Sequence, residues 1–262
     1  MKKILQYLLK ILSRIILWKY QPEVVAITGS VGKTSAKEAI IQVLGKYFRA
    51  RGNQRNYNNE IGVPLTILGI EGGGSSFWLW AKVFLRAVSM IIFREEYPEI
   101  LILEMGVDRP GDMAYLTSFV PVDVAVVTAI GEFPSHLEFF PEKDKLVGEK
   151  SILVQSVGRE GLAILNYDDI SVRAMADEFS ENIKTTTYGF GEGADIQISN
   201  YSFYLSDLEK GDYGATFKIE YEGGLVPFRI KKMLGKQQAF AVAAATGVGM
   251  SFGLNLIEIS SA

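Results

Sequence analysis

Residues 24–37 read VVAITGSVGKTSAK, and this stretch decides the fold of the chain. It joins a short β-branched run to a glycine loop that ends in Gly-Lys-Thr, and a helical pattern follows. A strand that ends at Thr28 delivers residues 29–32 to the carboxyl edge of a sheet, where backbone N–H groups and a helix N-terminus bind phosphate oxygens. The stretch therefore predicts a nucleoside triphosphate site. The alternative interpretation is an ordinary tight turn between a strand and a helix.

The side chains of this loop suit a nucleotide and its metal ion. Lys33 supplies a positive charge for the β and γ phosphates, and the Thr34 hydroxyl is placed to bind Mg²⁺. The loop is a short variant, because only residues 30–31 separate its glycines, whereas the usual phosphate-binding loop has a longer spacer. The candidate nucleotide-binding residues of the loop are Gly29, Ser30, Val31, Gly32, Lys33, Thr34 and Ser35.

The composition is that of a globular enzyme, with 262 residues of which 48% are hydrophobic and 22% charged. The net charge of −3 and the lack of a basic cluster with interleaved aromatic residues argue against a nucleic-acid partner. The absence of cysteine excludes disulfides, thiolate nucleophiles and cysteine-bound zinc, and it agrees with a reducing compartment. We therefore expect a cytoplasmic protein. Any histidine-dependent site would depend on His136 alone.

Residues 1–21 form a basic, amphipathic helical segment of their own. Apolar residues recur there at helical spacing, at Ile4, Leu5, Leu8, Leu9, Leu12, Ile15 and Ile16. Charges interrupt the segment too often for a helix that crosses a bilayer. Residues 2–19 could instead lie on the anionic inner face of the cell membrane, with Trp18 and Tyr20 at the interface. A helix docked on the domain explains the same pattern, and both interpretations remain open.

A second apolar stretch, residues 77–93, follows a glycine- and serine-rich run. Lys82, Arg86 and Ser89 interrupt it at helical spacing and leave one narrow polar stripe. This pattern favours a core helix packed against the sheet over contact with a membrane. Exposure of Trp78 would favour membrane contact instead, and so would exposure of Trp80.

The rest of the chain reads as an open, mostly parallel sheet with flanking helices. Buried strands are predicted at residues 100–104, 122–128 and 161–166. They end in Glu104, Thr128 and Asn166, which should converge on the edge that holds the glycine loop.

The pattern changes over residues 195–230 to short alternating segments with glycines between them, which predicts a small antiparallel subsheet near the C-terminus. An alanine-rich helix at residues 237–252 closes the chain, and little follows it.

Five ordered motifs give the chain a family resemblance. They are TGSVGKTS at residues 28–35, NYNNEIGVP at 56–64, LEMGVDRPGD at 103–112, HLEFF at 136–140 and LNYDD at 165–169. Together they resemble the central ATPase domain of Mur ligases over residues 22–262. Within that family, residues 58–64 are most similar to the branch that adds D-alanyl-D-alanine to a UDP-N-acetylmuramoyl tripeptide.

The resemblance implies an α/β fold of the P-loop type and an ATP-dependent ligase that forms an amide bond through an acyl phosphate in peptidoglycan synthesis. It implies two Mg²⁺ ions, the first held by Thr34 and Glu104 and the second by His136. Lys150 matches the family lysine that is carbamylated, which would make it an oxygen ligand for Mg²⁺. Lys33, Lys150 and His136 would then be the catalytic residues.

Substrate contacts follow from the same resemblance. Asn166 and Asp169 would border the adenine and ribose of ATP, while Asn58 and Asn59 would lie toward the UDP-N-acetylmuramoyl peptide. The second substrate would be D-alanyl-D-alanine or a related amine.

The chain departs from the family pattern in several places. We expect it to lack the N-terminal UDP-sugar domain and the C-terminal Rossmann-like domain, the latter supplied by the full-length protein or by a separate chain. Ala241 stands where the family has an adenine-facing asparagine, Ala129 replaces another asparagine, and residues 132–135 lengthen a loop.

An alternative hypothesis is therefore a nucleotide-binding module or scaffold at the membrane, inactive without a partner. An amide ligase of the folylpolyglutamate synthase type is a third, less favoured by residues 58–64.

Overall fold

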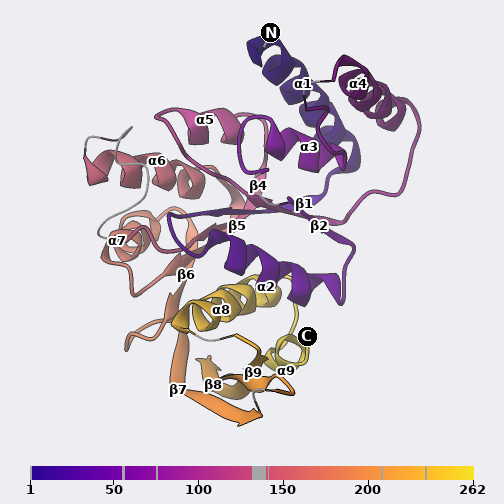
Figure 1. The fold of residues 1–262 in the computed structure, drawn as a ribbon. Helices are drawn as coiled ribbons and strands as arrows, with labels where there is room; N and C mark the ends of the chain where they lie inside the picture. The colour runs from indigo at the N-terminus through magenta and orange to yellow at the C-terminus, as the bar shows by residue number, and fades with distance from the viewer. Residues whose placement is uncertain are drawn as a thin grey trace.

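The computed structural model describes residues 2–54, 57–74, 76–131, 140, 142–207, 209–233 and 235–262. These residues build one sheet covered by helices on both faces (Figure 1). The strands of the described part follow the order β2-β3-β1-β4-β5-β6-β7-β8-β9. The predicted α/β class is confirmed.

The sheet has a parallel part and an antiparallel part. Its strands are β1 (Glu23–Thr28), β2 (Ala50–Gly52), β3 (Ile100–Glu104), β4 (Val122–Val127), β5 (Val157–Asn166), β6 (Lys184–Gly189), β7 (Ile196–Asp207), β8 (Asp212–Tyr221) and β9 (Gly224–Lys231). All pairs from β2 to β7 are parallel, and β7, β8 and β9 pair antiparallel. The three predicted parallel strands and the predicted antiparallel subsheet are therefore confirmed. The subsheet continues the main sheet, because β7 also pairs with β6.

The helices connect these strands. They are α1 (Lys2–Tyr20), α2 (Lys33–Gly45), α3 (Gly62–Leu68), α4 (Phe77–Ile92), α5 (Asp112–Thr117), α6 (Lys143–Gln155), α7 (Ile170–Phe179), α8 (Lys236–Ser251) and α9 (Leu256–Ser260). The final helix of the sequence analysis is α8. A further short helix, α9, follows it and begins with a capping box formed by Asn255 and Glu258.

The core lies on both faces of the parallel strands. In β1, Val24 and Ala26 point toward the layer that holds α1, α3, α4 and α5, while Val25 and Ile27 point toward α2 and α8. Because successive strand residues face opposite ways, a strand covered on both faces is apolar throughout. This arrangement leaves the carboxyl edge of the sheet for polar residues.

The two apolar helical stretches lie side by side at one end of the molecule (Figure 1). The predicted helix at residues 77–93 is confirmed as α4, but the prediction that it is a core helix packed against the sheet is wrong. Of its side chains only Val83, Ala87 and Met90 are buried, since α4 packs beside α1 at the rim of the fold. Within the described part of the chain, no helix is both long enough and apolar enough to cross a membrane.

Candidate functional site

The glycine loop connects β1 to α2 and needs glycine at both ends. Gly29 has φ +144° and Gly32 has φ +90°, conformations that side chains with a Cβ rarely adopt. At Gly29 a Cβ would also lie 2.0 Å from Oγ1 of Thr128. The polar end of β4 therefore packs directly against the loop, as the strand pattern predicted.

Backbone hydrogen bonds fix the loop to β4. The N–H groups of Ser30 and Val31 donate to the carbonyl oxygen of Ala129 at 2.8 and 3.0 Å. This contact uses only the backbone of Ala129, so it does not need the asparagine that the family pattern has there. The buried Ser30 hydroxyl has no hydrogen-bond partner within the described part of the chain. It is a polar group in the loop that a phosphate oxygen could satisfy.

Two lysines converge on one carbonyl oxygen of the loop. Lys33 Nζ donates to the carbonyl of Gly29 at 2.8 Å, and Lys150 Nζ donates to the same oxygen at 2.9 Å. Lys150 comes from α6 and is only 3% exposed. The structure thus brings together two catalytic candidates that are far apart in the sequence.

Burial makes both amines less basic. Burial, together with the smaller effect of the nearby charge of Lys33, lowers the pKa of Lys150 to about 7. Burial also lowers the pKa of Lys33, although the carboxylates of Glu104 and Asp108 oppose that shift. At neutral pH a large fraction of Lys150 is therefore an uncharged, nucleophilic amine.

The candidate metal ligands meet at the end of β3. The Thr34 hydroxyl donates to Oε2 of Glu104 at 3.1 Å, and Nδ2 of Asn58 donates to Oε1 of the same carboxylate at 3.3 Å. Glu104 is only 7% exposed. A hydroxyl and a carboxylate are the hard oxygen donors that Mg²⁺ prefers, so this pair fits that ion.

Two further residues of this region were missed in the sequence analysis. Lys37 is buried with Nζ 3.8 Å from Oε2 of Glu104, and it also donates to the carbonyl of Asn53 at 2.9 Å. The side chain of Asn53 in turn bonds both backbone groups of Glu104. The sequence did hold a signal for Lys37, because it lies at helical spacing from the apolar residues Ile40 and Leu44 and is therefore on a stripe that is expected to be buried. Asn53 follows β2, a strand too short to show a pattern.

The predicted substrate residues Asn58 and Asn59 border a small cleft beside Glu104. The carbonyl of Asn58 accepts a hydrogen bond from the N–H of Gly106 at 2.7 Å. Oδ1 of Asn59 accepts from the N–H groups of Ile61 and Gly62, which begins α3. Both asparagines therefore lie on the side of the loop next to the candidate metal ligands.

A second small cleft lies on the opposite flank of the loop. It is lined by Val31, Gly32, Ala36, Thr128, Ala129, Asn166, Tyr188, Gln237, Phe240 and Ala241. Asn166, at the end of β5, is buried there. The Asp169 carboxylate has a structural role, because it connects the segment after β4 to the start of α7. It accepts hydrogen bonds from the N–H groups of Ile130 and Gly131 and caps the N-terminus of α7.

One candidate cannot be placed. His136 lies outside the described residues, as does the loop at residues 132–135, so its role stays a prediction. Among the described residues, no group of three or more His, Cys, Asp or Glu side chains could hold a metal ion. Among the described residues, Thr34 and Glu104 would hold a first metal ion together with ligands from nucleotide or water.

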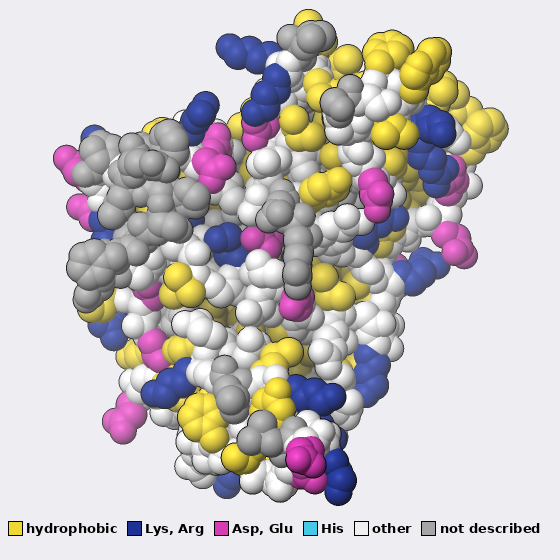
Figure 2. Space-filling model, in the orientation of Figure 1, with side chains coloured by type: hydrophobic (Ala, Val, Ile, Leu, Met, Phe, Trp, Pro, Cys, Tyr) yellow, Lys and Arg dark blue, Asp and Glu magenta, His cyan; other side chains and the backbone are white. Residues whose placement is uncertain are grey.

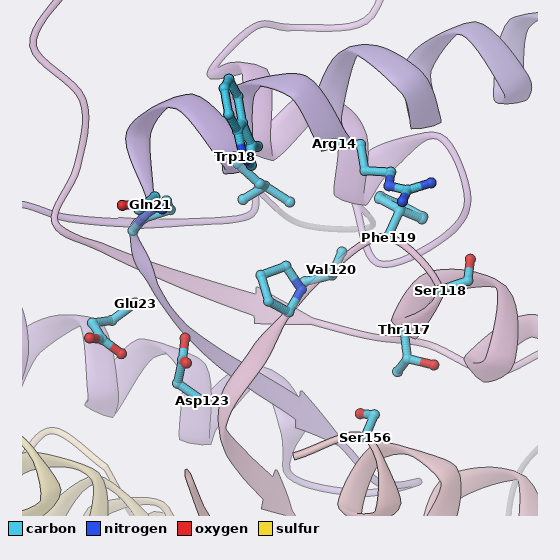
Figure 3. Close-up of a pocket in the computed structure, with 13 residues that line it drawn as sticks. Arg14, Trp18, Gln21, Glu23, Thr117, Ser118, Phe119, Val120, Asp123 and Ser156 are labelled. Carbon is cyan, nitrogen blue, oxygen red and sulfur yellow. The ribbon is translucent and has the colours of Figure 1, made fainter. Parts of the chain in front are cut away.

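A cavity of about 560 Å³ opens far from this site, at the amino ends of β1 and β4. Figure 3 shows Arg14 and Trp18 of α1 on one side of it, with Glu23 and Asp123 on the other. None of the predicted site residues lines it. The chemistry is therefore expected at the opposite edge of the sheet, where the glycine loop lies.

Comparison with known protein families gives the chain its family. The family model for the Mur ligase middle domain matches residues 87–249. The chain belongs to the Mur ligase family. This confirms the resemblance drawn from the five sequence motifs.

Two relatives within the family carry the same name. The UDP-N-acetylmuramoyl-tripeptide–D-alanyl-D-alanine ligase of Bacillus subtilis is 29% identical over 231 residues, which is 88% of this chain and 42% of that protein. The ligase of the same name from Mycobacterium leprae is 33% identical over 154 residues, 59% of this chain and 25% of that protein. The chain therefore spans less than half the length of these curated relatives.

The fold agrees with this assignment. The structure of the MurF ligase from Thermotoga maritima, solved in complex with ADP, superposes with a TM-score of 0.76 at 25% sequence identity. The match covers 98% of this chain and 52% of the Thermotoga maritima chain. MurF from Acinetobacter baumannii has a TM-score of 0.77 at 22% identity, covering 98% of this chain and 49% of its own. This second likeness concerns the fold alone.

Proposed function

We propose that residues 22–262 are the ATP-binding domain of a ligase that joins D-alanyl-D-alanine, or a related amine, to a UDP-N-acetylmuramoyl peptide in peptidoglycan synthesis. The observation that carries this proposal is the convergence of Lys33, Thr34, Glu104 and Lys150 on one glycine loop. The shared name of the relatives supports the choice of substrates. Residues 1–21 form a separate N-terminal helix in this proposal.

ATP would place its triphosphate on residues 29–35. Lys33 donates to carbonyl oxygens of its own loop in this structure, and the phosphates would replace these carbonyls as its partners. They would also accept a hydrogen bond from the Ser30 hydroxyl, which has no partner among the described residues. The adenine and ribose would extend toward Asn166 and the turn held by Asp169. Ala241 lines the same cleft, so a small apolar wall stands where the family has an asparagine.

The first Mg²⁺ would be held by Thr34 and Glu104, and a second by His136 and a carbamylated Lys150. Bound Mg²⁺ would neutralise negative charge as the substrate carboxylate approaches the triphosphate. Carbamylation needs an unprotonated amine, whose nitrogen attacks the carbon of CO₂ and loses a proton. The lowered pKa of Lys150 supplies that amine near neutral pH.

The bonds of this reaction form and break between the substrates, so the side chains of the protein take little part in covalent chemistry. A carboxylate oxygen of the muramoyl peptide attacks the γ phosphorus, and ADP leaves. The amine nitrogen attacks the acyl carbon, phosphate leaves with the bonding electrons, and the nitrogen loses a proton to the departing phosphate or to water. Lys33 and the loop N–H groups stabilise the charge on the transferred phosphoryl group. Selection of the amine would fall to a further domain, on the same or a separate chain.

We also propose that residues 2–19 make peripheral contact with the inner face of the cell membrane. The support for this is the outward stripe of α1, which stays apolar and exposed although the helix is docked on the domain.

The ligase proposal is tested by mixing the chain with ATP, Mg²⁺, UDP-N-acetylmuramoyl tripeptide and D-alanyl-D-alanine. Amide product with stoichiometric phosphate release supports it. Nucleotide binding without product, persisting after a C-terminal ligase domain is supplied as a second chain, would favour a nucleotide-binding module or scaffold instead. A full-length relative under the same conditions serves as the positive control.

A further inference from the structure

The outward face of α1 is apolar along its whole length. Its exposed large residues recur at helical spacing, at Ile4, Tyr7, Leu8, Ile11, Ile15 and Trp18. The opposite stripe, which includes Leu9, Ile16 and Leu17, is buried in the core. A docked helix of a water-soluble domain usually turns a polar face outward. Here Trp18 is 78% exposed and Ile4 is 65% exposed, so burial against the domain does not account for the outer stripe.

Helix α4 repeats this arrangement. Its exposed apolar residues are Phe77, Trp78, Leu79, Leu85, Val88 and Ile92. Its buried residues are Val83, Ala87 and Met90, on the side of the helix away from Leu85, Val88 and Ile92. Leu79 lies in line with this buried stripe and is exposed in the first turn. Trp78 is 77% exposed and Leu85 is 70% exposed. Two neighbouring helices therefore each present an apolar surface that no described part of the chain covers.

The two helices are held as one unit. Their buried stripes belong to the same core cluster, so their outer stripes both face away from it. Lys19 Nζ donates to the carbonyl oxygens of Met90 at 2.9 Å and Phe93 at 2.7 Å, and the Tyr20 hydroxyl donates to that of Met90 at 3.0 Å. Figure 2 shows apolar side chains gathered at this end of the molecule, over α1 and α4. We call the exposed apolar residues of α1 and α4 the two-helix face.

Cations surround the two-helix face. Neither helix contains an aspartate or a glutamate, although the whole chain has a net charge of −3. The cationic residues of the two helices are Lys2, Lys3, Lys10, Arg14, Lys19, Lys82 and Arg86. Two acidic groups at the rim are each paired with one of these cations, since Glu60 lies 3.0 Å from Lys2 and Glu95 contacts Arg86. The local charge therefore opposes the overall charge.

We infer that the two-helix face docks on the surface of a bilayer that contains anionic phospholipids. Apolar side chains would enter the boundary between headgroups and acyl chains, and the flanking cations would meet lipid phosphates. A second copy of the chain is a poorer occupant, because it would bring the same cations against one another. This inference extends the contact proposed for α1 to a surface of two helices, which fixes how the domain sits on the membrane. It does not depend on the ligase reaction.

The distribution of tryptophan makes the face directly observable. Trp18, Trp78 and Trp80 are the three tryptophans of the chain, and all lie on α1 and α4. Tryptophan emission excited at about 295 nm therefore reports on these two helices, with Trp18 and Trp78 exposed on the two-helix face and Trp80 half-buried beside it. We expect vesicles of phosphatidylcholine mixed with phosphatidylglycerol to shift the emission of the full chain to shorter wavelength. Brominated acyl chains should quench it, and vesicles of phosphatidylcholine alone should do so far less.

Matched substitutions test whether both helices take part. The paired change Leu85→Ser with Ile92→Ser on α4, and the paired change Ile4→Ser with Ile15→Ser on α1, should each weaken co-sedimentation with the anionic vesicles at least about tenfold. The control pair is Leu205→Ser with Ile257→Ser, because these residues are 65% and 72% exposed outside the two-helix face. The control pair should bind like the unmodified chain.

Charge is tested in the same assay. Lys82→Glu should weaken binding to anionic vesicles, whereas Lys231→Glu on β9 should not. ADP affinity should stay unchanged in every variant, which separates this inference from the ligase proposal and shows that the variants fold. The inference is overturned if the full chain ignores anionic vesicles, if the control pair loses binding equally, or if the α4 pair has no effect. A lipid-free dimer that the α4 pair dissociates would overturn it as well.

Discussion

The Nζ atom of Lys150 lies 2.9 Å from the carbonyl oxygen of Gly29, so α6 reaches the phosphate loop with a buried amine. Lys33 donates to the same oxygen. Two amines around one carbonyl repel each other when both are charged, and burial adds to that cost. Burial is the larger cause of the fall in the pKa of Lys150 to about 7 and the charge of Lys33 is the second, and the two predictions on Lys150 that follow depend on this shift.

Lys150 should form a carbamate with dissolved CO₂. The unprotonated amine increases as the pH rises through about 7, so the carbamate should increase over the same range. With ¹³C-labelled bicarbonate, the chain should give a carbamate carbon signal in NMR spectra that grows between about pH 6 and about pH 8.

The variant Lys150→Arg serves as the control for that experiment, because a guanidinium stays protonated over this range. It should give no signal. A signal of equal size in this variant, or one that first appears near the pKa of an exposed lysine, would show that the modified group lies elsewhere.

The charge on Lys150 should also make stability depend on pH. Since the folded-state pKa is lowered, the unfolded chain binds the extra proton between about pH 7 and the ordinary lysine value of 10.5. The cost to the fold is therefore present in full below about pH 7 and disappears as the pH rises toward 10.5. The free energy of unfolding of the unmodified chain should rise by about 2 kcal/mol relative to Lys150→Met between pH 7 and pH 9.

Urea unfolding in CO₂-free buffer measures this difference. A constant offset between the two proteins is expected from the lost hydrogen bond to Gly29, and only the slope with pH tests the pKa. Parallel stability curves over this range would mean that Lys150 is as basic in the fold as in the unfolded chain.

The buried pair of Lys37 and Glu104 should be strongly coupled. Lys37→Met leaves the carboxylate without its nearby cation, which should lower the free energy of unfolding by about 3 kcal/mol in the presence of a metal chelator. Adding Glu104→Gln to that variant should recover part of the loss, because the unpaired charge is gone. Urea unfolding of the two single variants and the double variant measures the coupling. Effects that add within about 0.5 kcal/mol would mean that the two groups act independently.

Gly29 should tolerate no side chain. Gly29→Ala would place a Cβ 2.0 Å from Oγ1 of Thr128 in a backbone conformation with φ +144°. We expect a loss of at least about 2 kcal/mol in the free energy of unfolding and weaker binding of ADP. Gly148→Ala on α6 is the matched control, because nothing lies within 4 Å of the added Cβ. It should stabilise the helix by about 0.5–1 kcal/mol. Equal stability of the two variants would show that the loop is not held against β4.

Much of the site could be predicted from the sequence because it follows strand ends. Glu104 and Asn166 are the last residues of parallel strands, while the glycine loop and Thr128 directly follow such strands, and parallel strands bring these residues to one edge. Lys37 could not be found this way. It lies on a helix, and its partner Glu104 is brought near only by the fold. The proximity of Lys150 to the loop likewise depends on the packing of α6 against β4 and β1.

The α4 prediction shows where periodicity stops being informative. The pattern of residues 77–93 correctly indicated a helix, but both of its faces are apolar, so the pattern could not say which face is buried. The structure decides this, because only the stripe with Val83 and Ala87 meets the core. The N-terminal helix had the same ambiguity: the docked interpretation is correct for one stripe, and the other stripe stays exposed.

The central claim is that the loop from Gly29 to Lys33 binds the phosphates of a nucleotide. Isothermal titration calorimetry of the chain with a nonhydrolysable ATP analogue and Mg²⁺ tests it most directly, using Lys33→Ala beside the unmodified chain. We predict measurable binding by the unmodified chain and an affinity at least about tenfold lower in the variant, with its thermal unfolding still cooperative. Equal affinity in the two proteins, or no binding by the unmodified chain, would contradict the account.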